Sequence, residues 1–369
     1  GGDLRSGGSL TLSSSNADIV QIAAPNGVGG SVQAAGVVQV NAGNGRIALG
    51  NAGNRFGGAL NLSGGDINVA ADTLLLGSVN AGGQLSLASA GDIRQQGAVQ
   101  VAGTTRLSAG GDIDLQAAGN RFGDAVAVQG RQVALASTDP LQLQGVTADS
   151  LIARSGGHLS LGAAGIAGNT TIEGASLLLD GAIIGGTLLA TAHAGAIRQG
   201  SGSMAIGNNS QLTASTDIVL GGTGNQLGSA LQVQGRDITL SSSTALDIQQ
   251  LQAARDAVLA GNGVQLGATS VQGTLQVNST GAITQSAALQ VAGNSRFQAG
   301  SDITLDQAGN RFDGSVALQG ANVILGTSGG LLFDTVSVSG NLDARAGSAG
   351  VSQQAAVQVG GRSDVRTQG

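Results

Sequence analysis

Residues 94–122 read RQQGAVQVAGTTRLSAGGDIDLQAAGNRF, and residues 284–312 read TQSAALQVAGNSRFQAGSDITLDQAGNRF. The two stretches align without a gap, and 17 of their 29 positions are identical. Both end in the string AGNRF, which also occurs at residues 52–56. A chain with this self-similarity is built from repeats, so the length and pattern of one repeat decide its fold.

The spacing of these strings gives the length of the repeat. The asparagines of AGNRF are Asn54, Asn120 and Asn310, and a looser copy, TGNQL at residues 223–227, adds Asn225. The intervals 54–120, 120–225 and 225–310 are close to three, five and four units of equal length. The sequence therefore predicts a unit of about 21 residues, repeated about 17 times over the chain.

Within a unit, apolar residues alternate with polar ones over only two or three positions. The pairs Leu60/Leu62, Ile67/Val69 and Leu74/Leu76 show the pattern, and it returns at 126–143 and 316–333. A period of two over a short stretch indicates a strand with one buried face. Gly-Gly, Gly-Asp and Asn-Gly sequences lie between the pairs and form corners. Three short strands and their corners make one triangular coil.

A single coil of this size cannot bury enough apolar surface to fold alone, whereas stacked coils pair every strand with its neighbours. The sequence predicts an all-β fold, a right-handed parallel β-helix, because crossovers between parallel strands are right-handed by default. We expect residues 1–369 to form one continuous segment of a longer shaft, cut at both ends. The alternative is a tandem of antiparallel sandwiches with hairpins at Asn26-Gly27, Asn44-Gly45 and Asn262-Gly263.

Composition narrows the class of protein. The chain has 65 Gly, five Phe, and no Trp, Tyr or Cys, yet 41% of its residues are apolar. This hydrophobic share is too high for a disordered linker, and the lack of Cys excludes disulfides and cysteine metal sites. A net charge of −6 argues against nucleic acid as a partner. No apolar run is long enough to span a bilayer as a helix, so we expect no membrane insertion.

The motifs resemble a known family. The AGNRF turns, the strings AGDI and GGDI at 90–93 and 110–113, and QQGAVQVAG at 95–103 are similar to the shaft of filamentous-haemagglutinin-like exoproteins. These are large bacterial adhesins of the two-partner secretion pathway. The family's secretion domain carries Asn-Pro-Asn motifs, which Pro25-Asn26-Gly27 does not match, and Gly235-Arg236-Asp237 is not an Arg-Gly-Asp cell-binding triplet.

The resemblance implies a structural and adhesive shaft that mediates cell–cell or cell–matrix attachment. It also implies an outer-membrane two-partner-secretion transporter as partner, secretion to the bacterial cell surface or extracellular matrix, and exopolysaccharide or host glycan as ligand. A second hypothesis is that this segment itself binds polysaccharide through its polar faces. A third, a β-helical polysaccharide lyase or hydrolase, is disfavoured because such sites are walled by Tyr, Trp or Lys, and the chain has none of them. We expect no enzyme activity.

Acidic residues are the first candidates for chemistry. Asp92 and Asp112 are about one coil apart in sequence, as are Asp217 and Asp237, so each pair could stack at one corner and hold a cation. The structural alternative, which we favour, is that each Asp caps its turn through backbone N–H groups, with Arg236 shielding its neighbour.

The histidines and the repeat turns complete the candidates. His158 and His193 are not separated by a whole number of coils, so we expect both on the surface and on different faces. In each repeat turn we expect the Asn to adopt the left-handed conformation, the Phe to dock against the coil, and Arg55, Arg121 or Arg311 to point outward. We expect no catalytic residue, cofactor or metal. The predicted structural turn residues are Asn54, Phe56, Asn120, Phe122, Asn225, Asn310 and Phe312.

Overall fold

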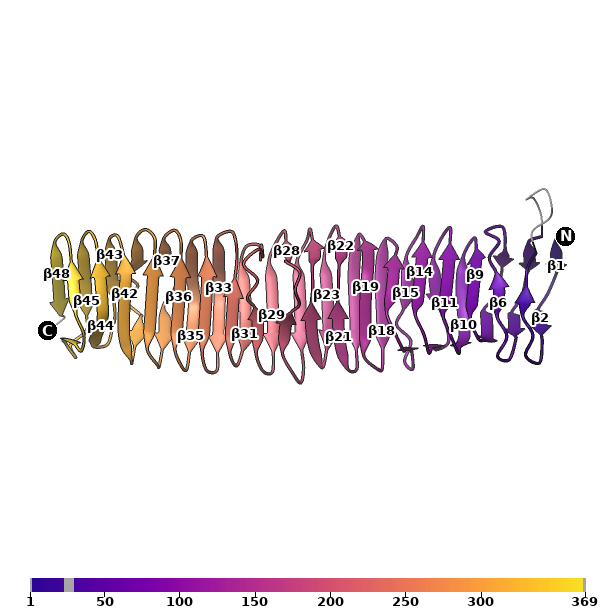
Figure 1. Ribbon diagram of the computed structural model, residues 1–369, viewed down its shortest axis with the longest axis horizontal. Helices are drawn as coiled ribbons and strands as arrows, with labels where there is room; N and C mark the ends of the chain where they lie inside the picture. The colour runs from indigo at the N-terminus through magenta and orange to yellow at the C-terminus, as the bar shows by residue number, and fades with distance from the viewer. Residues whose placement is uncertain (1, 23–29, 368–369) are drawn as a thin grey trace. The chain divides into compact units, whose positions relative to one another are not determined.

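The computed structural model describes residues 2–22 and 30–367. The chain is an all-β parallel β-solenoid of about 17 turns with about 20 residues per turn, and its described residues form no helix. It divides into two compact units, Gly1–Leu178 with Ala182–Ile184, and Leu179–Gly181 with Gly185–Gly369. In each unit, strands from successive turns lie side by side (Figure 1). The parallel stacking predicted from the repeats is confirmed.

The strands up to residue 184 are β1 (Leu4–Ser6), β2 (Leu10–Ser13), β3 (Ile19–Val20), β4 (Val32–Ala34), β5 (Val38–Asn41), β6 (Ile47–Leu49), β7 (Arg55–Phe56), β8 (Leu60–Gly64), β9 (Ile67–Ala71), β10 (Leu74–Ala81), β11 (Leu85–Ser89), β12 (Ile93–Gln95), β13 (Val99–Val101), β14 (Thr105–Ala109), β15 (Ile113–Leu115), β16 (Arg121–Phe122), β17 (Val126–Gln129), β18 (Gln132–Ser137), β19 (Leu141–Ala148), β20 (Ser150–Ser155), β21 (His158–Leu161), β22 (Ala164–Ile166), β23 (Thr170–Gly174), β24 (Ser176–Leu179) and β25 (Ala182–Ile184).

The later strands are β26 (Leu188–Ala192), β27 (Ile197–Gln199), β28 (Ala205–Ile206), β29 (Ser210–Ala214), β30 (Ile218–Leu220), β31 (Leu231–Gly235), β32 (Ile238–Ser241), β33 (Leu246–Ala253), β34 (Ala257–Gly261), β35 (Val264–Val271), β36 (Leu275–Ser279), β37 (Ile283–Gln285), β38 (Leu289–Val291), β39 (Ser295–Ala299), β40 (Ile303–Leu305), β41 (Arg311–Phe312), β42 (Ser315–Gly320), β43 (Val323–Gly326), β44 (Leu331–Val338), β45 (Leu342–Ala346), β46 (Val351–Gln353), β47 (Val357–Val359) and β48 (Ser363–Thr367).

One turn of the solenoid consists of three short strand segments, as the coils at 93–109 and 113–129 show. β12, β13 and β14 of one coil pair in parallel with β15, β16 and β17 of the next. In some coils one longer strand runs through a corner, and β10 therefore pairs with both β12 and β13. Three faces per coil follow directly from the three alternating segments in the sequence.

No hairpin forms at the Asn-Gly sequences that the sandwich alternative needs and that the structure describes. Asn262-Gly263 connects β34 to β35, but β34 pairs in parallel with β32 and β36, one coil before and one coil after. Asn44-Gly45 precedes β6, which pairs in parallel with β3 and β9. Asn26-Gly27 lies outside the described residues. The two described turns are corners between faces of a coil.

Apolar side chains, nearly all of them aliphatic, recur at the same place in each coil and form the core. In the second unit, Leu240, Leu259, Val277, Phe297 and Leu318 follow one another in register, and each is at most 2% exposed. Fully burying such a side chain stabilises the fold by about 1.5–3 kcal/mol. The apolar pairs at 60–76, 126–143 and 316–333 that predicted the strands are all buried. The alternating pattern therefore identifies the inward face correctly.

Coil length varies because the corners absorb extra residues. The sequence separation of register partners grows from Leu60 and Leu76, through Ile93 and Ile113, to Leu4 and Val32. The tightness of other corners accounts for much of the glycine. A Cβ added to Gly110 or Gly300 would come closer than 3.0 Å to a carbonyl oxygen of the preceding coil. Such close approach between coils requires residues without side chains.

Candidate functional site

The repeat turn is built around a reciprocal pair of side-chain amides. Asn120 donates from Nδ2 to Gln95 Oε1 at 2.9 Å, and Gln95 donates from Nε2 to Asn120 Oδ1 at 2.8 Å. The two residues come from successive coils. Asn120 Oδ1 also accepts from the backbone N–H of Val99 at 2.9 Å, and its Nδ2 donates to the carbonyl of Leu115 at 3.0 Å.

The same arrangement, which we call the amide clamp, occurs four times in the described residues. Each clamp joins an Asn of the repeat turn, whose exposed fraction is 0%, to a Gln of the preceding coil. The pairs are Gln21–Asn54, Gln95–Asn120, Gln199–Asn225 and Gln285–Asn310. Buried amides stabilise a fold when all their donors and acceptors are paired. The clamp therefore joins adjacent coils through buried amides whose hydrogen-bonding groups are paired.

A clamp also reaches the coil that follows. Asn310 Nδ2 donates to the carbonyl of Gly326 at 3.1 Å, and the backbone carbonyl of Asn310 accepts from the hydroxyls of Thr327 and Ser328 at 3.0 and 2.9 Å. With Gln285 on the other side, one asparagine holds three successive coils. This side chain is a structural centre of the repeat.

The left-handed conformation predicted for these asparagines is wrong. Among the described residues other than glycine, Ala230, at φ 54°, is the one with a positive φ. At the second clamp the left-handed position is taken by Gly119, at φ 88°, so Asn120 keeps an ordinary backbone and turns its amide inward. The asparagine is needed for its side-chain hydrogen bonds and not for its backbone freedom.

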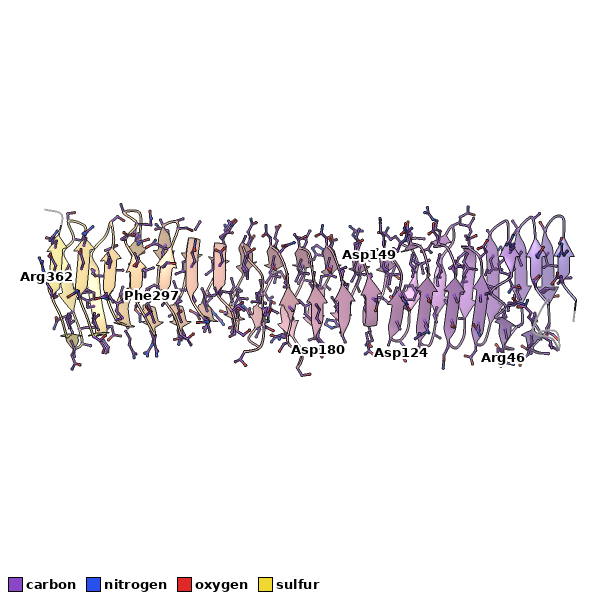
Figure 2. The ribbon with its side chains drawn as sticks, turned by 90° about the horizontal axis from the view of Figure 1, so that it is seen from above. Arg46, Asp124, Asp149, Asp180, Phe297 and Arg362 are labelled. Atoms are coloured by element: carbon purple, nitrogen blue, oxygen red, sulfur yellow. The ribbon has the colours of Figure 1, made fainter. Side chains whose placement is uncertain are left out.

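The aromatic residues of the repeat turns are buried against their coils, as predicted. Phe56, Phe122 and Phe312 are 6%, 3% and 4% exposed, and Leu227 of the looser copy is 1% exposed. Phe312 contacts Phe297 edge to face, with ring centroids 6.0 Å apart. Arg55, Arg121 and Arg311 are exposed. Figure 2 shows Phe297 among the side chains of its unit.

The glutamine partners were missed in the sequence reasoning. Gln95, Gln199 and Gln285 each end a strand that reads Ile-X-Gln, and each precedes its asparagine by a nearly constant distance in sequence. That spacing is slightly longer than one coil. It brings the glutamine and the asparagine together only when one coil is stacked on the next. The recurring Ile-X-Gln was the available signal.

Acidic residues at another corner bind the backbone of the next coil. Asp92 Oδ1 accepts from the backbone N–H of Asp112 at 2.9 Å, and Asp112 Oδ1 accepts from that of Gln132 at 3.3 Å. Other Asp and Asn side chains also accept from a backbone N–H of the next coil, among them Asp66, Asp237, Asp256, Asp302, Asn322 and Asn341. The N–H of Asp112 lowers the pKa of Asp92, assisted by Arg94, against burial, which raises it. Asp92 therefore binds a backbone N–H, as the structural alternative predicts, but this N–H belongs to the next coil and not to its own turn.

Asp217 and Asp237 are joined through arginine. Arg236 lies 2.9 Å from Asp217 and 3.5 Å from Asp237, and Arg198 lies 3.7 Å from Asp217. Arg255 continues the series by contacting Asp237 and Asp256. Burial raises the pKa of Asp237, but the hydrogen bonds from Arg255 and from the backbone N–H of Asp256, together with the charges of Arg255 and Arg236, outweigh it, and the net pKa is lowered. Alternating charges thus link successive coils at this corner.

No group of three or more His, Asp or Glu side chains within residues 2–22 and 30–367 lies close enough to hold a metal ion. His158, in the first unit, is half-buried and not fully exposed as predicted, because its Nδ1 lies 2.8 Å from Ser176 Oγ. His193, in the second unit, is exposed. No helix in the described part of the chain has the length and apolarity needed to cross a membrane.

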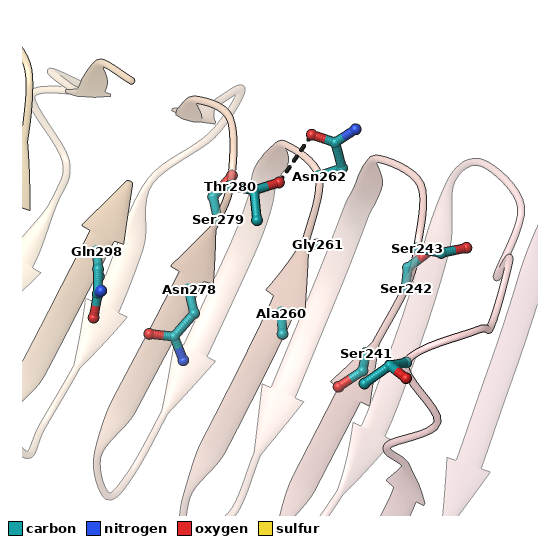
Figure 3. Close-up of a pocket in the computed structure, with 11 residues that line it drawn as sticks. Ser241, Ser242, Ser243, Ala260, Gly261, Asn262, Asn278, Ser279, Thr280 and Gln298 are labelled. Atoms are coloured by element: carbon teal, nitrogen blue, oxygen red, sulfur yellow. Dashed lines mark hydrogen bonds between the residues drawn. The ribbon is translucent and has the colours of Figure 1, made fainter. Parts of the chain in front are cut away.

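A polar groove in the second unit is a further candidate site. It has a volume of about 370 Å³ and lies at the carboxyl ends of β32, β34, β36 and β39 (Figure 3). It crosses four coils, and its lining carries no charged residue. The lining residues are Thr223, Ser241, Ser242, Ser243, Ala260, Gly261, Asn262, Asn278, Ser279, Thr280 and Gln298.

Comparison with known proteins identifies the repeat. Residues 2–63, 64–129, 167–234, 254–319 and 320–369 match the family described as Repeats of unknown function (DUF5649), and the chain belongs to this family. No curated protein matches the chain. No solved structure matches it.

The repeats coincide with the clamps. Each of the first four matched segments contains one clamp asparagine close to its carboxyl end, in the order Asn54, Asn120, Asn225 and Asn310. The unmatched stretch 130–166 holds two coils, since Gln129, Thr147 and Gly165 are successive register partners. The stretch 235–253 holds about one coil. Each of the first four repeats is therefore a block of about three coils with one clamp, and the material between blocks is added in whole coils. The fifth segment, 320–369, has no clamp within the described residues.

Proposed function

We propose that this chain is shaft material of a large secreted bacterial adhesin, at the cell surface or in the biofilm matrix, where it supports cell–cell or cell–matrix attachment. The observation that carries the proposal is the block organisation, with one clamp in each of the first four repeats and additional coils inserted whole. Coils of this kind can be added or removed without disturbing the stack, because each coil contacts only its neighbours. A scaffold is the class of function that benefits from such variation.

Two further features support the proposal. A solenoid gains its stability from nearest neighbours, so it can fold coil by coil as it leaves a narrow pore, which suits export through an outer-membrane two-partner-secretion transporter. The repeat turns and the Gly-Asp-Ile corners also resemble the shafts of filamentous-haemagglutinin-like exoproteins. We propose the same route of secretion and the same location for this chain.

The proposal assigns no reaction to the chain. Glycoside cleavage uses a carboxylic acid and a carboxylate that face the substrate. Here Asp92 and Asp237 are held by arginines and by backbone N–H groups of the next coil. Incubation with candidate glycans, followed by assay of new reducing or unsaturated ends, tests this part. Release of either kind of end would overturn it.

The scaffold role is tested by excising coils from the full-length protein in its own bacterium. Deletion of 130–165 removes two whole coils, because Gln129 and Gly165 occupy the same place in their coils and Ile166 then follows Gln129. Deletion of 130–157 is the control. It joins β17 directly to β21 and removes one coil together with one further strand, β20. β21 then takes the place of β18, on a different face of the coil from the one that it normally occupies.

We expect the whole-coil variant to reach the cell surface in protease-resistant form and to support attachment. We expect the control variant to lose surface display and attachment together, because its strands cannot pair in register. Attachment that survives loss of display, or equal behaviour of the two variants, would contradict the proposal.

A further inference from the structure

The polar groove of the second unit contains hydrogen-bonding groups that the fold does not use. Asn278 and Gln298 stand beside each other on adjacent coils, in register on β36 and β39, and both are half-buried. The side chains of Ser241 and Asn278 make no hydrogen bond to any other described residue. Among the same residues, Gln298 engages only its Oε1, with Arg296 at 3.4 Å.

The groove is shaped by small and inward-turned residues. Ala260 continues the same outward row between Ser241 and Asn278, and it leaves a depression between them. Ser242 and Ser279 are 8% and 7% exposed, and their hydroxyls donate to the carbonyls of Asn225 and Ala282. The groove is therefore shallow over the small side chains of Ser241 and Ala260, and the amides of Asn278 and Gln298 lie at one end of the row.

One amide at the rim is held in place. Thr280 Oγ1 donates to Asn262 Oδ1 at 2.9 Å, which leaves the Nδ2 of Asn262 as the outward donor (Figure 3). Fixing an amide before a ligand arrives reduces the entropy lost on binding. Asn262, Asn278 and Gln298 together offer donors and acceptors on three successive coils.

The chemistry of the lining restricts the ligand. The absence of charge from the lining disfavours anionic polymers, which are bound through Arg or Lys. A peptide strand would add to an unpaired sheet edge, but β34 and β36 are each paired on both sides. Sugar hydroxyls donate and accept at once, and neighbouring hydroxyls match an amide group. The coil spacing of about 4.8 Å is close to the length of one sugar ring.

We propose that this groove binds a neutral oligosaccharide lying across the coils, held by Asn278, Gln298 and Asn262. The inference goes beyond the scaffold function and does not depend on it. No aromatic ring lines the groove, so stacking contributes nothing, and we expect a dissociation constant on the order of 1 mM. Many copies along a polymer would be needed for firm attachment.

The first unit supplies a matched control. The offset that aligns 94–122 with 284–312 also pairs Ala260, Asn278 and Gln298 with earlier positions. Those positions hold Ala70, Ala88 and Ser108. Each of them is the register partner of the next, as Ala260, Asn278 and Gln298 are in the second unit. The same local fold therefore forms without the amides.

Exchange of these residues gives two variants. The double variant N278A/Q298S gives the second unit the residues of the first at the two amide positions. At the positions of Asn262 and Thr280 the first unit has Asp72 and Ala90, so the reverse variant D72N/A88N/A90T/S108Q gives it the three amides and the rim contact of the second.

The test is titration of the ¹⁵N-labelled full chain with cellohexaose, neutral mannohexaose and an alginate hexasaccharide, while the side-chain amide resonances are followed. We expect at least one neutral hexasaccharide to shift Asn278 and Gln298. We expect N278A/Q298S to weaken binding at least tenfold with an unchanged circular dichroism spectrum, and D72N/A88N/A90T/S108Q to add a second site.

Three results would overturn the inference. They are alginate binding in place of the neutral sugars, binding that N278A/Q298S leaves intact, and no shift with either neutral sugar up to about 10 mM, ten times the expected dissociation constant. The scaffold proposal is judged by coil excision and surface display, so its failure is separate from failure of the groove.

Discussion

Residues 70–122 of the first unit and residues 260–312 of the second follow the same path but present different surfaces. Both have an inward column of aliphatic residues, and both have a clamp, Gln95 with Asn120 and Gln285 with Asn310. Outward positions differ, since Ala88 and Ser108 correspond to Asn278 and Gln298. The comparison separates what the fold requires, the column and the clamp, from what it leaves open, the outward row.

Removal of a clamp asparagine should have the largest effect. Asn310→Ala removes a buried partner from the N–H of Leu289, from the carbonyls of Leu305 and Gly326, and from Gln285, which keeps its bonds to Ala287 and Gln307. We therefore expect a loss of about 3–5 kcal/mol. Hydrogen exchange of the amides in the surrounding coils measures it locally, since a repeat protein need not unfold in two states.

The two clamps should not respond identically. Asn310 bonds to Gly326 in the following coil, and no matching bond from the side chain of Asn120 is seen within the described residues. Asn310→Ala should therefore destabilise its coils more than Asn120→Ala destabilises its own. Equal or reversed losses would show that the contact to the following coil contributes little.

Glycine substitution at the tight corners comes next. Gly110→Ala and Gly300→Ala each place a methyl group closer than 3.0 Å to a backbone carbonyl oxygen of the preceding coil, so we expect a loss of about 1–3 kcal/mol at both. Gly165→Ala is the control, because a Cβ there meets nothing within 4 Å. Thermal unfolding monitored by circular dichroism compares the three. Similar melting at all three positions would refute the tight-corner explanation for the glycine content.

Acid should produce a smaller effect that distinguishes the two regions. The pKa of Asp92 is lowered, chiefly by the N–H of Asp112, while the corresponding position of the second region is Ala282. A lowered pKa means that the contribution of Asp92 to stability is complete above the ordinary Asp pKa and is lost as the pH falls through the folded value.

Hydrogen exchange of the Asp112 amide at pH 6 and pH 3 tests this. We expect protection at Asp112 to fall at the lower pH, once the intrinsic rate is corrected, and protection at the corresponding Asp302 to change less. Asp92→Asn keeps an acceptor oxygen without the titration, so it should flatten the dependence. A drop at Asp112 that persists in Asp92→Asn would assign the effect to another group.

The sequence was sufficient for the architecture and insufficient for the contacts between coils. The pairs Leu60/Leu62 and Ile67/Val69 predict strands because alternation is local, and the AGNRF intervals predict coil length because corners recur. The predicted unit is slightly longer than the observed average of about 20 residues per turn because individual corners gain or lose residues.

The role of the asparagines could not be inferred in the same way. Asn120 was predicted to bend the backbone, but its amide pairs with Gln95, which becomes a neighbour only when one coil is placed on another. The groove depends on the same stacking, since Asn278 and Gln298 belong to successive coils and are adjacent in space.

The central claim, that successive coils lie in parallel register on one another, can be tested directly because the chain has no cysteine. Gln100 and Arg121 are register partners in the first unit, and Gln290 and Arg311 are the same residues in the second. Partners on adjacent parallel strands are about 4.8 Å apart, within reach of a disulfide. We predict that Q100C/R121C and Q290C/R311C each form an intramolecular disulfide under mild oxidation, found by mass spectrometry of the digested protein. Failure of both pairs to form a disulfide while the chain keeps its β spectrum would contradict the stacked register.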